Sequence, residues 1–354
     1  MNKIGLVIPN WNGEKNLKFC LNSIKKQTYK NFEVFIVDNG SKDESVQIIK
    51  GFSDFKLIEL KENTGFAKAS NIGIRAALKD KNIRYVCPLN NDIKLDKNYL
   101  AELVELAQEL DRKKVKLGIL AAKLYFKNQV DLLNTTGTLI QRDGSGMEKA
   151  FKVIDKGQYK KTVEIFGSCG AAALYTKKML QEISFRNSQG ENCYFDEDFF
   201  AYYEDLDLNY RSRLMGYKAY FCPKAIGYHV HSATGVSFSG FKSFYVHRNQ
   251  YYVLIKNFPF PFLVLGFLML PFRYFLLVIS AVVRKGPSAE LKKNVGGGGL
   301  VKIVLKSWIG VVKNVKPLCQ KRKIIQRKRK VSLKTFNSWF KKYKASYKKM
   351  IFYK

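Results

Sequence analysis

The sequence predicts an α/β fold in which a mostly parallel sheet, covered by helices on both faces, precedes a C-terminal membrane-associated helical region. Two observations carry this prediction. Strand-like and helix-like segments alternate through the first 120 residues, which is typical of parallel sheets because each crossover needs a connecting helix. A long apolar segment and a strongly basic stretch follow after residue 255. The 354 residues suit a catalytic domain of about 240 residues with an appendage.

The first elements alternate regularly. Short apolar runs predict strands over 3–9, 32–37, 55–60 and 85–89. Apolar residues at helical spacing predict the helices between them, around 17–24, 46–52 and 65–77. Polar residues stand at the ends of these strands, namely Asn10, Asp38, Asn63 and Asn90. Because ligands of parallel sheets bind beyond the carboxyl ends of the strands, we expect these side chains to share one site.

The following elements are less regular. The pattern predicts helices over 98–110 and 201–214 and strands over 117–121, 132–140 and 218–226. The second of these helices carries Glu204 and Asp205 in its first turn, where the helix dipole favours carboxylates. Small residues fill 167–173, which allows either close approach of a ligand or tight packing in the core.

Positive charge is concentrated at the end of the chain. From Arg284 onward we count 22 lysines and arginines against one acid, Glu290, so this fifth of the chain carries +21 of the net +33. Such density favours a polyanionic partner, either nucleic acid or an anionic membrane surface, over a merely solvated tail.

The segment 258–283 is long and apolar enough to span a bilayer, but Arg273 and three prolines interrupt it. An interfacial or re-entrant hairpin is therefore favoured over a straight span. Beyond a flexible joint at 296–299, apolar residues repeat at helical spacing from Val304 to Leu318 among lysines. This pattern predicts a basic amphipathic helix on a membrane surface, or one docked on the catalytic domain.

Cysteine usage and the N-terminal residues bear on location. The six cysteines form no C-x-x-C pair, which argues against a zinc site or a disulfide framework and favours a reducing compartment. The apolar run before Pro9 is too short for a secretory signal. We therefore expect a protein at the cytoplasmic face of the membrane with three regions, a catalytic domain (1–255), an apolar segment (256–285) and a basic tail (286–354).

An acidic cluster stands out in this basic chain. Six carboxylates occur between Phe195 and Arg211, an arrangement that is costly unless a cation or a proton uses it. Asn90-Asn91-Asp92 ends a predicted strand far upstream, and His229 lies downstream. Carboxylate, amide and imidazole groups together suit a divalent cation and a general base, which indicates an enzyme.

Six motifs follow one another in a fixed order. They read V-I-P-N-W-N from Val7, I-V-D-N-G-S from Ile36, N-T-G-F-A from Asn63, L-N-N-D from Leu89, F-D-E-x-F-F-x-Y-x-E-D-x-D-L-x-x-R from Phe195, and Y-H-x-x-S-A-T from Tyr228. This set resembles family 2 glycosyltransferases over residues 3–255, and it is most similar to the rhamnosyltransferase-like branch that works on cell-surface glycans. The resemblance implies the GT-A fold of nucleotide-diphospho-sugar transferases, a nucleotide-sugar donor, a divalent cation and inversion at the anomeric carbon.

The resemblance also implies a metal site. Asp92 is similar to the final aspartate of the family's D-x-D motif, while Asn90 stands where the first carboxylate would be, so that weaker binding of Mg²⁺ or Mn²⁺ is expected. Asn90 and Asn91 would then face a ribose hydroxyl or a metal-bound water. His229 resembles the imidazole that completes the metal shell, and His231 could compete for that role.

Asp205 resembles the general base that takes the proton of the acceptor hydroxyl, with Glu204 as the next candidate. The other acids of the cluster are expected to cap helices, to pair with arginine or to lie on the acceptor side; they are Asp196, Glu197, Asp198 and Asp207. Arg211 would either pair with one of these acids or steady the diphosphate.

The donor nucleotide is implied as well. Asp38 resembles the carboxylate that accepts the N3–H of uracil or thymine, which points to a dTDP- or UDP-sugar. The same base pocket would include Pro9, Asn10 and Asn12. A loop and helix would lie along the nucleotide through Asn63, Gly65, Phe66 and Asn71, with Gly65 permitting close backbone approach and Lys68 near a phosphate.

Two other hypotheses compete with an inverting transferase that acts on a glycan or lipid-linked acceptor. A nucleic-acid-binding protein could use the aromatic residues of the basic tail for stacking on bases, but the apolar segment 258–283 suits lipid better than nucleic acid. An inactive, scaffold-like family member is the other alternative, because Asn90 departs from the motif. The branch implies rhamnose, but the sequence fixes neither the sugar, nor the acceptor, nor the oligomeric state.

Overall fold

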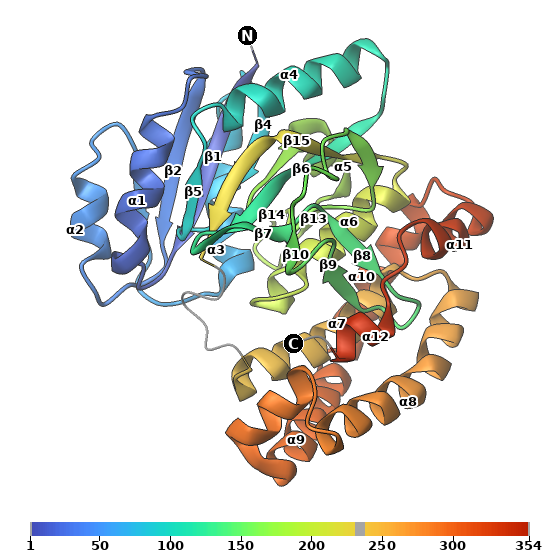
Figure 1. Ribbon diagram of the computed structural model, residues 1–354. Helices are drawn as coiled ribbons and strands as arrows, with labels where there is room; N and C mark the ends of the chain where they lie inside the picture. Colours follow the sequence, from blue (N-terminus) through green and yellow to red (C-terminus); the bar gives the residue numbers. More distant parts are fainter. Residues whose placement is uncertain (1, 231–237, 353–354) are drawn as a thin grey trace.

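The computed structural model describes residues 2–230 and 238–352, and it contains a central mixed sheet flanked by helices (Figure 1). The main path through the sheet runs β10-β7-β6-β12-β4-β1-β2-β3, and β15 joins it along the other side of β6. The predicted α/β class is therefore confirmed. The motif Y-H-x-x-S-A-T continues into 231–237, which lie outside the described residues, as does His231.

Four parallel strands form the N-terminal half of the sheet, as the alternating pattern predicts. The elements are β1 (Lys3–Asn10), α1 (Glu14–Lys25), β2 (Phe32–Asp38), α2 (Ser45–Lys50), β3 (Lys56–Glu59), α3 (Phe66–Leu78) and β4 (Ile83–Pro88). Asn10 and Asp38 are register partners at the ends of β1 and β2. The carboxyl ends of these strands therefore meet at one edge, where we expected a ligand.

Antiparallel strands and short hairpins complete the sheet. These elements are β5 (Ile93–Leu95), α4 (Tyr99–Arg112), β6 (Leu117–Phe126), β7 (Gln129–Thr135), β8 (Thr138–Ile140), β9 (Gly146–Glu148), β10 (Val153–Ile154), β11 (Val163–Ile165), β12 (Ala173–Thr176), α5 (Lys177–Ile183), β13 (Phe185–Arg186), β14 (Asn192–Cys193), α6 (Glu204–Leu214) and β15 (Lys218–His229), with a 3-10 turn at Glu197–Phe199.

Two predicted boundaries in this half are wrong. The strand predicted over 132–140 breaks into β7 and β8 around Gly137, whose φ of 129° ends the extended run. The helix predicted from residue 201 begins only at Glu204. Phe200, Tyr202 and Tyr203 have φ values of 63°, 67° and 70°, so the chain there cannot be helical.

Alternating side chains of β1 divide the core between the two faces of the sheet. Ile4, Leu6 and Ile8 belong to a cluster that includes α1 and α4, whereas Val7 belongs to one that includes α3, α5 and α6. The two clusters hold the helices on opposite faces and fix the strand ends between them.

The C-terminal helices build a third core against α6. They are α7 (Gly240–Asn257), α8 (Phe260–Val282), α9 (Pro287–Lys313), α10 (Val315–Lys328), α11 (Leu333–Lys342) and α12 (Tyr347–Phe352). Trp339, Phe340 and Tyr343 of the tail are buried in this core. These rings are therefore not available for stacking on nucleic-acid bases, and the second half of the tail is part of the folded domain.

The apolar segment differs from its prediction. α8 is one continuous helix of 23 residues that passes through Pro271, so the hairpin expected within 258–283 is wrong. In α9, the backbone departs from helical geometry at Gly296 (φ 70°, ψ 171°), where the flexible joint was predicted. The helix expected from Val304 to Leu318 is broken at Asn314, and Val311 and Leu318 of its apolar seam pack into the third core.

α8 and α9 are both long and apolar enough to cross a membrane, by length and composition, and they lie at the bottom of Figure 1, away from α4 at the top. Both present exposed apolar side chains. On α8, these include Phe260, Val264, Leu268, Phe272, Phe275, Val278 and Val282, and on α9, they include Val301, Leu305, Trp308, Ile309 and Val312.

Candidate active site

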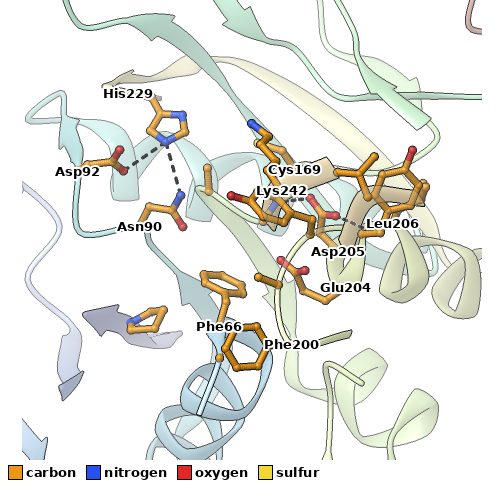
Figure 2. Close-up of a pocket in the computed structure, with 18 of the residues that line it drawn as sticks. Phe66, Asn90, Asp92, Cys169, Phe200, Glu204, Asp205, Leu206, His229 and Lys242 are labelled. Atoms are coloured by element: carbon orange, nitrogen blue, oxygen red, sulfur yellow. Dashed lines mark hydrogen bonds and ion pairs between the residues drawn. The ribbon is translucent and has the colours of Figure 1, made fainter. Parts of the chain in front are cut away.

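A cavity of about 770 Å³ opens at the carboxyl edge of the parallel strands and is lined from several parts of the fold. Figure 2 shows side chains of this cavity, which come from strand ends, α3, α6 and α7. Eleven of the predicted site residues line it, whereas Asn12, Asp38, Lys68, Asn71 and Arg211 do not. Those brought together are Pro9, Asn10, Asn63, Gly65, Phe66, Asn90, Asn91, Asp92, Glu204, Asp205 and His229.

Asp38 and Asn12 lie beside the cavity without lining it. Asp38 is 2% exposed, and its carboxylate accepts hydrogen bonds from Asn10 Nδ2 at 2.8 Å and from Ser41 Oγ at 2.6 Å. The side chain of Asn12 accepts a hydrogen bond from the backbone of Lys42. Both side chains hold the loops after β1 and β2, and Asp38 is bonded to Asn10 of the cavity wall. Their contact with a nucleobase stays a prediction.

Asn71 does not line the cavity either. Its Oδ1 accepts from the backbone N–H groups of Tyr194 and Phe195, each at 3.0 Å, and its Nδ2 donates to Phe195 O at 2.8 Å. With these bonds inside the protein, Asn71 ties α3 to the acidic segment and supports the site from behind. Its contact with a nucleotide stays a prediction.

A network of amides shapes the donor side of the cavity. Asn91 Nδ2 donates to Asn10 Oδ1 at 2.7 Å, which fixes the ends of β1 and β4 relative to each other. Asn39, which the sequence reasoning missed, donates to Asn63 Oδ1 at 3.0 Å and to Gly65 O at 3.2 Å. Gly65 has a φ of 87°, and a Cβ there would lie 2.6 Å from the Phe200 ring. Only glycine fits this approach.

Asp92 and His229 form a buried pair, with Asp92 Oδ1 3.2 Å from His229 Nε2 (Figure 2). The other ring nitrogen, Nδ1, lies 3.1 Å from Asn134 Oδ1. Nε2 faces Asp92 and also lies 3.4 Å from Asn90 Nδ2. An imidazole nitrogen and a carboxylate oxygen thus converge on one point, and both are groups that bind metal ions.

The atoms around this pair fit a divalent cation. Among the described residues, Asp92 Oδ1 accepts no hydrogen bond. No group of three or more His, Cys, Asp or Glu side chains that could hold a metal occurs in the described part of the chain. A Mg²⁺- or Mn²⁺-type ion commonly takes only one or two carboxylates and completes its shell with substrate phosphates and water. Asp92 and His229 are the two residues of the cavity that could hold such an ion together with a diphosphate.

Glu204 and Asp205 begin α6 and face the cavity (Figure 2). Asp205 accepts hydrogen bonds from Gly170 N at 2.8 Å and Leu206 N at 2.7 Å, while burial raises the pKa of its carboxyl. Glu204 is 7% exposed, and its Oε2 has no hydrogen-bond partner among the described residues. Burial and the neighbouring Asp205 raise its pKa well above the ordinary value. Both carboxylates are thus disposed to take up protons.

Glu148 is a third carboxylate of the cavity that the sequence did not reveal. It ends β9, accepts a hydrogen bond from Thr135 Oγ1 at 2.5 Å, and has a pKa raised to about 8 by burial and by Asp205. No motif surrounds Glu148, and only the pairing of β8 with β9 brings it to the site. Further lining residues were also missed, including Trp11, Cys169, Phe200, Tyr203, Phe241 and Lys242.

The remaining acids of the cluster are paired with cations. Asp196 contacts Lys256 and Lys321, Asp207 contacts Lys256 at 2.7 Å, and Arg211 Nε donates to Asp207 at 2.8 Å. Burial alone would raise the pKa of Asp196, but the two lysines hold this pKa well below its usual range. Arg211 does not line the cavity. Its position supports the structural alternative over the diphosphate alternative.

Comparison with known proteins shows similarity to glycosyltransferases. The model of the family described as Glycosyl transferase family 2 matches residues 6–184, just over half of the 354 residues. The low-salt glycan biosynthesis hexosyltransferase of Haloferax volcanii is 25% identical over 218 residues, which cover 60% of this chain and 62% of that protein. Glycosyltransferase GlyA of Streptococcus pneumoniae serotype 4 is 36% identical over 104 residues, covering 28% and 14%. The chain spans less than two thirds of these relatives.

Solved structures support the fold class. A mannosyltransferase from Pyrobaculum calidifontis, in complex with GDP-Man and Mn²⁺, has a TM-score of 0.51 at 17% identity and covers 88% of this chain and 86% of its own. The structure of GalNAc-T7 with UDP, GalNAc and Mn²⁺ has a TM-score of 0.55 at 16% identity and covers 72% and 48%. At these identities the similarity concerns the fold, which is GT-A-like as predicted.

Proposed function

The chain belongs to glycosyl transferase family 2, and we propose that it transfers a sugar from a nucleotide-diphospho-sugar to a hydroxyl group, with inversion at the anomeric carbon. One observation carries the proposal: the Asp92–His229 pair and the carboxylates of Glu204 and Asp205 line the same cavity. A cation-binding end and a proton-accepting end of one cavity are what an in-line displacement of a diphosphate by an alcohol requires.

The donor diphosphate would lie near Asp92 and His229, which would hold a divalent cation through one carboxylate oxygen and Nε2. When bound, such an ion neutralises charge on the departing diphosphate. Asn134 Oδ1, 3.1 Å from His229 Nδ1, would help to orient the ring so that Nε2 faces Asp92. Asn10, Asn39 and Asn91 present polar groups on the wall where the nucleoside would lie. Asp38, which is hydrogen-bonded to Asn10 of this wall, is the proposed partner for the N3–H of a uracil or thymine base.

The acceptor hydroxyl would approach Asp205, whose carboxylate takes its proton as the new glycosidic bond forms. Its two backbone hydrogen bonds hold the carboxylate in place, and burial favours the protonated product of that step. Inversion needs no enzyme nucleophile, because the alcohol attacks directly on the face opposite the leaving diphosphate. Glu204 and Glu148 line the same cavity as Asp205 and would bind hydroxyl groups of the acceptor.

A thermal-shift panel of nucleotide-sugars, with and without Mn²⁺, tests this function. We expect at least one UDP-, dTDP- or GDP-sugar to raise the melting temperature with Mn²⁺, and the gain to shrink in the His229→Ala variant. A dTDP-sugar effect that exceeds the others would favour the rhamnosyl branch. If no donor shifts the melting temperature with or without Mn²⁺, and no transfer to glycan acceptors is detected, the proposed function is wrong.

We also propose that α8 and α9 dock on the cytoplasmic face of an anionic membrane, where a glycan on a lipid carrier would be the acceptor. The exposed apolar residues of α8, from Val264 through Phe275 to Val282, recur every three or four positions and so form one stripe. Exposed basic residues accompany the helices, including Arg284, Lys285, Lys292, Lys293, Lys302, Lys306 and Lys313. An apolar face flanked by lysines suits an anionic lipid surface.

Flotation with liposomes containing anionic lipid tests this docking. The Leu268→Glu/Phe275→Glu double variant is expected to bind at least about 10-fold less, since burying each such side chain contributes about 1.5–3 kcal/mol. The matched control is Val130→Glu/Ile154→Glu, because these side chains are also more than half exposed but belong to β7 and β10. Equal binding by wild type and the α8 variant at low and high salt would contradict membrane docking.

A further inference from the structure

The segment that precedes the two cavity carboxylates has an unusual backbone. Phe200, Tyr202 and Tyr203 all have positive φ, at 63°, 67° and 70°. This region costs bulky residues about 1–3 kcal/mol each, and it persists only where surrounding contacts hold it. The next two residues are Glu204 and Asp205, so the direction in which α6 presents its carboxylates depends on how this segment is held.

The side chain of Asn249, on α7, holds the segment. Its Nδ2 lies 3.0 Å from Phe199 O, 2.9 Å from Ala201 O and 2.7 Å from Tyr202 O, so that its two hydrogens are shared among three carbonyls. Asn249 is fully buried, so losing these bonds would deprive the three carbonyl groups of a hydrogen-bond donor, which is costly. The three contacts come from a single residue of α7 that is 47 to 50 positions away in the chain.

Arg248 reinforces the same segment from its outer side. Its Nη2 donates to Asp198 O at 2.7 Å and to Phe199 O at 3.1 Å. On the other side, Phe200 O accepts from Ala67 N of α3 at 3.3 Å, and the Phe200 ring closes on Gly65. The segment therefore bridges α7 and the loop on the donor side of the cavity, with Asn249 at its centre.

We propose that Asn249 is a positioning residue that fixes the 199–203 segment and thereby aims Asp205 and the Phe200 wall of the cavity. Asn249 does not line the cavity, so it acts through the residues that do. The expected effect on turnover rests on the proposed function. The expected effect on how firmly residues 199–203 are held does not.

Asn249→Leu removes the donor while keeping a branched side chain of similar size. Turnover is expected to fall about 10- to 100-fold, because small misplacements of reacting groups have effects of this order. KM for the donor should change less than turnover does, since Asp92 and His229 are untouched and only the Phe200 ring borders the donor-side loop. In the Asp205→Asn background, Asn249→Leu should lower the residual rate by less than about 2-fold, because the two residues act through one group.

Gln250→Leu is the matched control, because Gln250 is the next residue of α7, is buried, and donates to Asp143 O instead. Hydrogen exchange across 199–206 should accelerate at least about 10-fold in Asn249→Leu and stay unchanged in Gln250→Leu. Unchanged exchange in Asn249→Leu overturns the proposal whether or not the protein transfers sugar. Faster exchange with unchanged turnover also overturns it. If wild type transfers no sugar, the proposed function fails, and the exchange result still decides whether Asn249 holds the segment.

Discussion

The Asp205→Asn variant is expected to turn over about 100- to 10,000-fold more slowly than wild type, which is the usual contribution of a positioned general base. Asparagine keeps the size of the side chain and one of the two oxygens that accept separately from Gly170 N and Leu206 N. It cannot take the proton of an incoming hydroxyl. Donor binding, measured as the thermal shift with Mn²⁺, should be nearly unchanged because Asp92 and His229 remain.

The pH profile provides a second measure of the same role. A base works in its deprotonated form, and burial raises the pKa of Asp205. The wild-type rate is therefore expected to rise with pH until Asp205 is ionised, and this acid limb should disappear from the residual rate of Asp205→Asn. Glu204→Gln is the control, with a smaller loss expected. Full turnover in Asp205→Asn together with its loss in Glu204→Gln would assign the base to Glu204.

Replacing Lys256 with methionine is expected to lower the free energy of unfolding by about 3–5 kcal/mol, the usual effect of removing one partner from a buried ion pair. Lys256 and its partners Asp196 and Asp207 are completely buried. Methionine fills most of the space but leaves two carboxylates without that charge. Urea denaturation at pH 7 measures the effect as a lower midpoint at constant slope.

The loss from Lys256→Met should become smaller as the pH is lowered. In wild type the lysines depress the pKa of Asp196, so the stabilisation is present above the unfolded value of about 4 and is lost as the pH falls toward the folded value. Without Lys256, Asp196 and Asp207 protonate more readily, which reduces the penalty in acid. Lys50→Met, at an exposed pair with Glu59, is the control and should change stability by less than about 1 kcal/mol. A loss for Lys256→Met as small as that would contradict the buried-pair argument.

The local pattern was sufficient to predict the edge of the sheet where the site lies. Parallel strands end together, so Asn10, Asn63 and Asn90 were expected at one site, and they line one cavity. The pattern could not tell which of two neighbouring residues faces the cavity. Asp38 turns toward Ser41, while Asn39, the next residue, faces the cavity and contacts Asn63. The direction of a side chain after a strand depends on the loop geometry, which the periodicity of the strand does not contain.

The sequence by itself determined the α/β order, the acidic cluster, and the apolar and basic character of the C-terminal region, because these depend on residue types and short spacings. Only the tertiary structure decided which acids remain available. Lys256 and Lys321 approach Asp196 from 60 and 125 positions away, and this pairing leaves Glu204 and Asp205 facing the cavity. Burial and counter-charges are properties of packing between distant segments. They therefore appear only when the chain is folded.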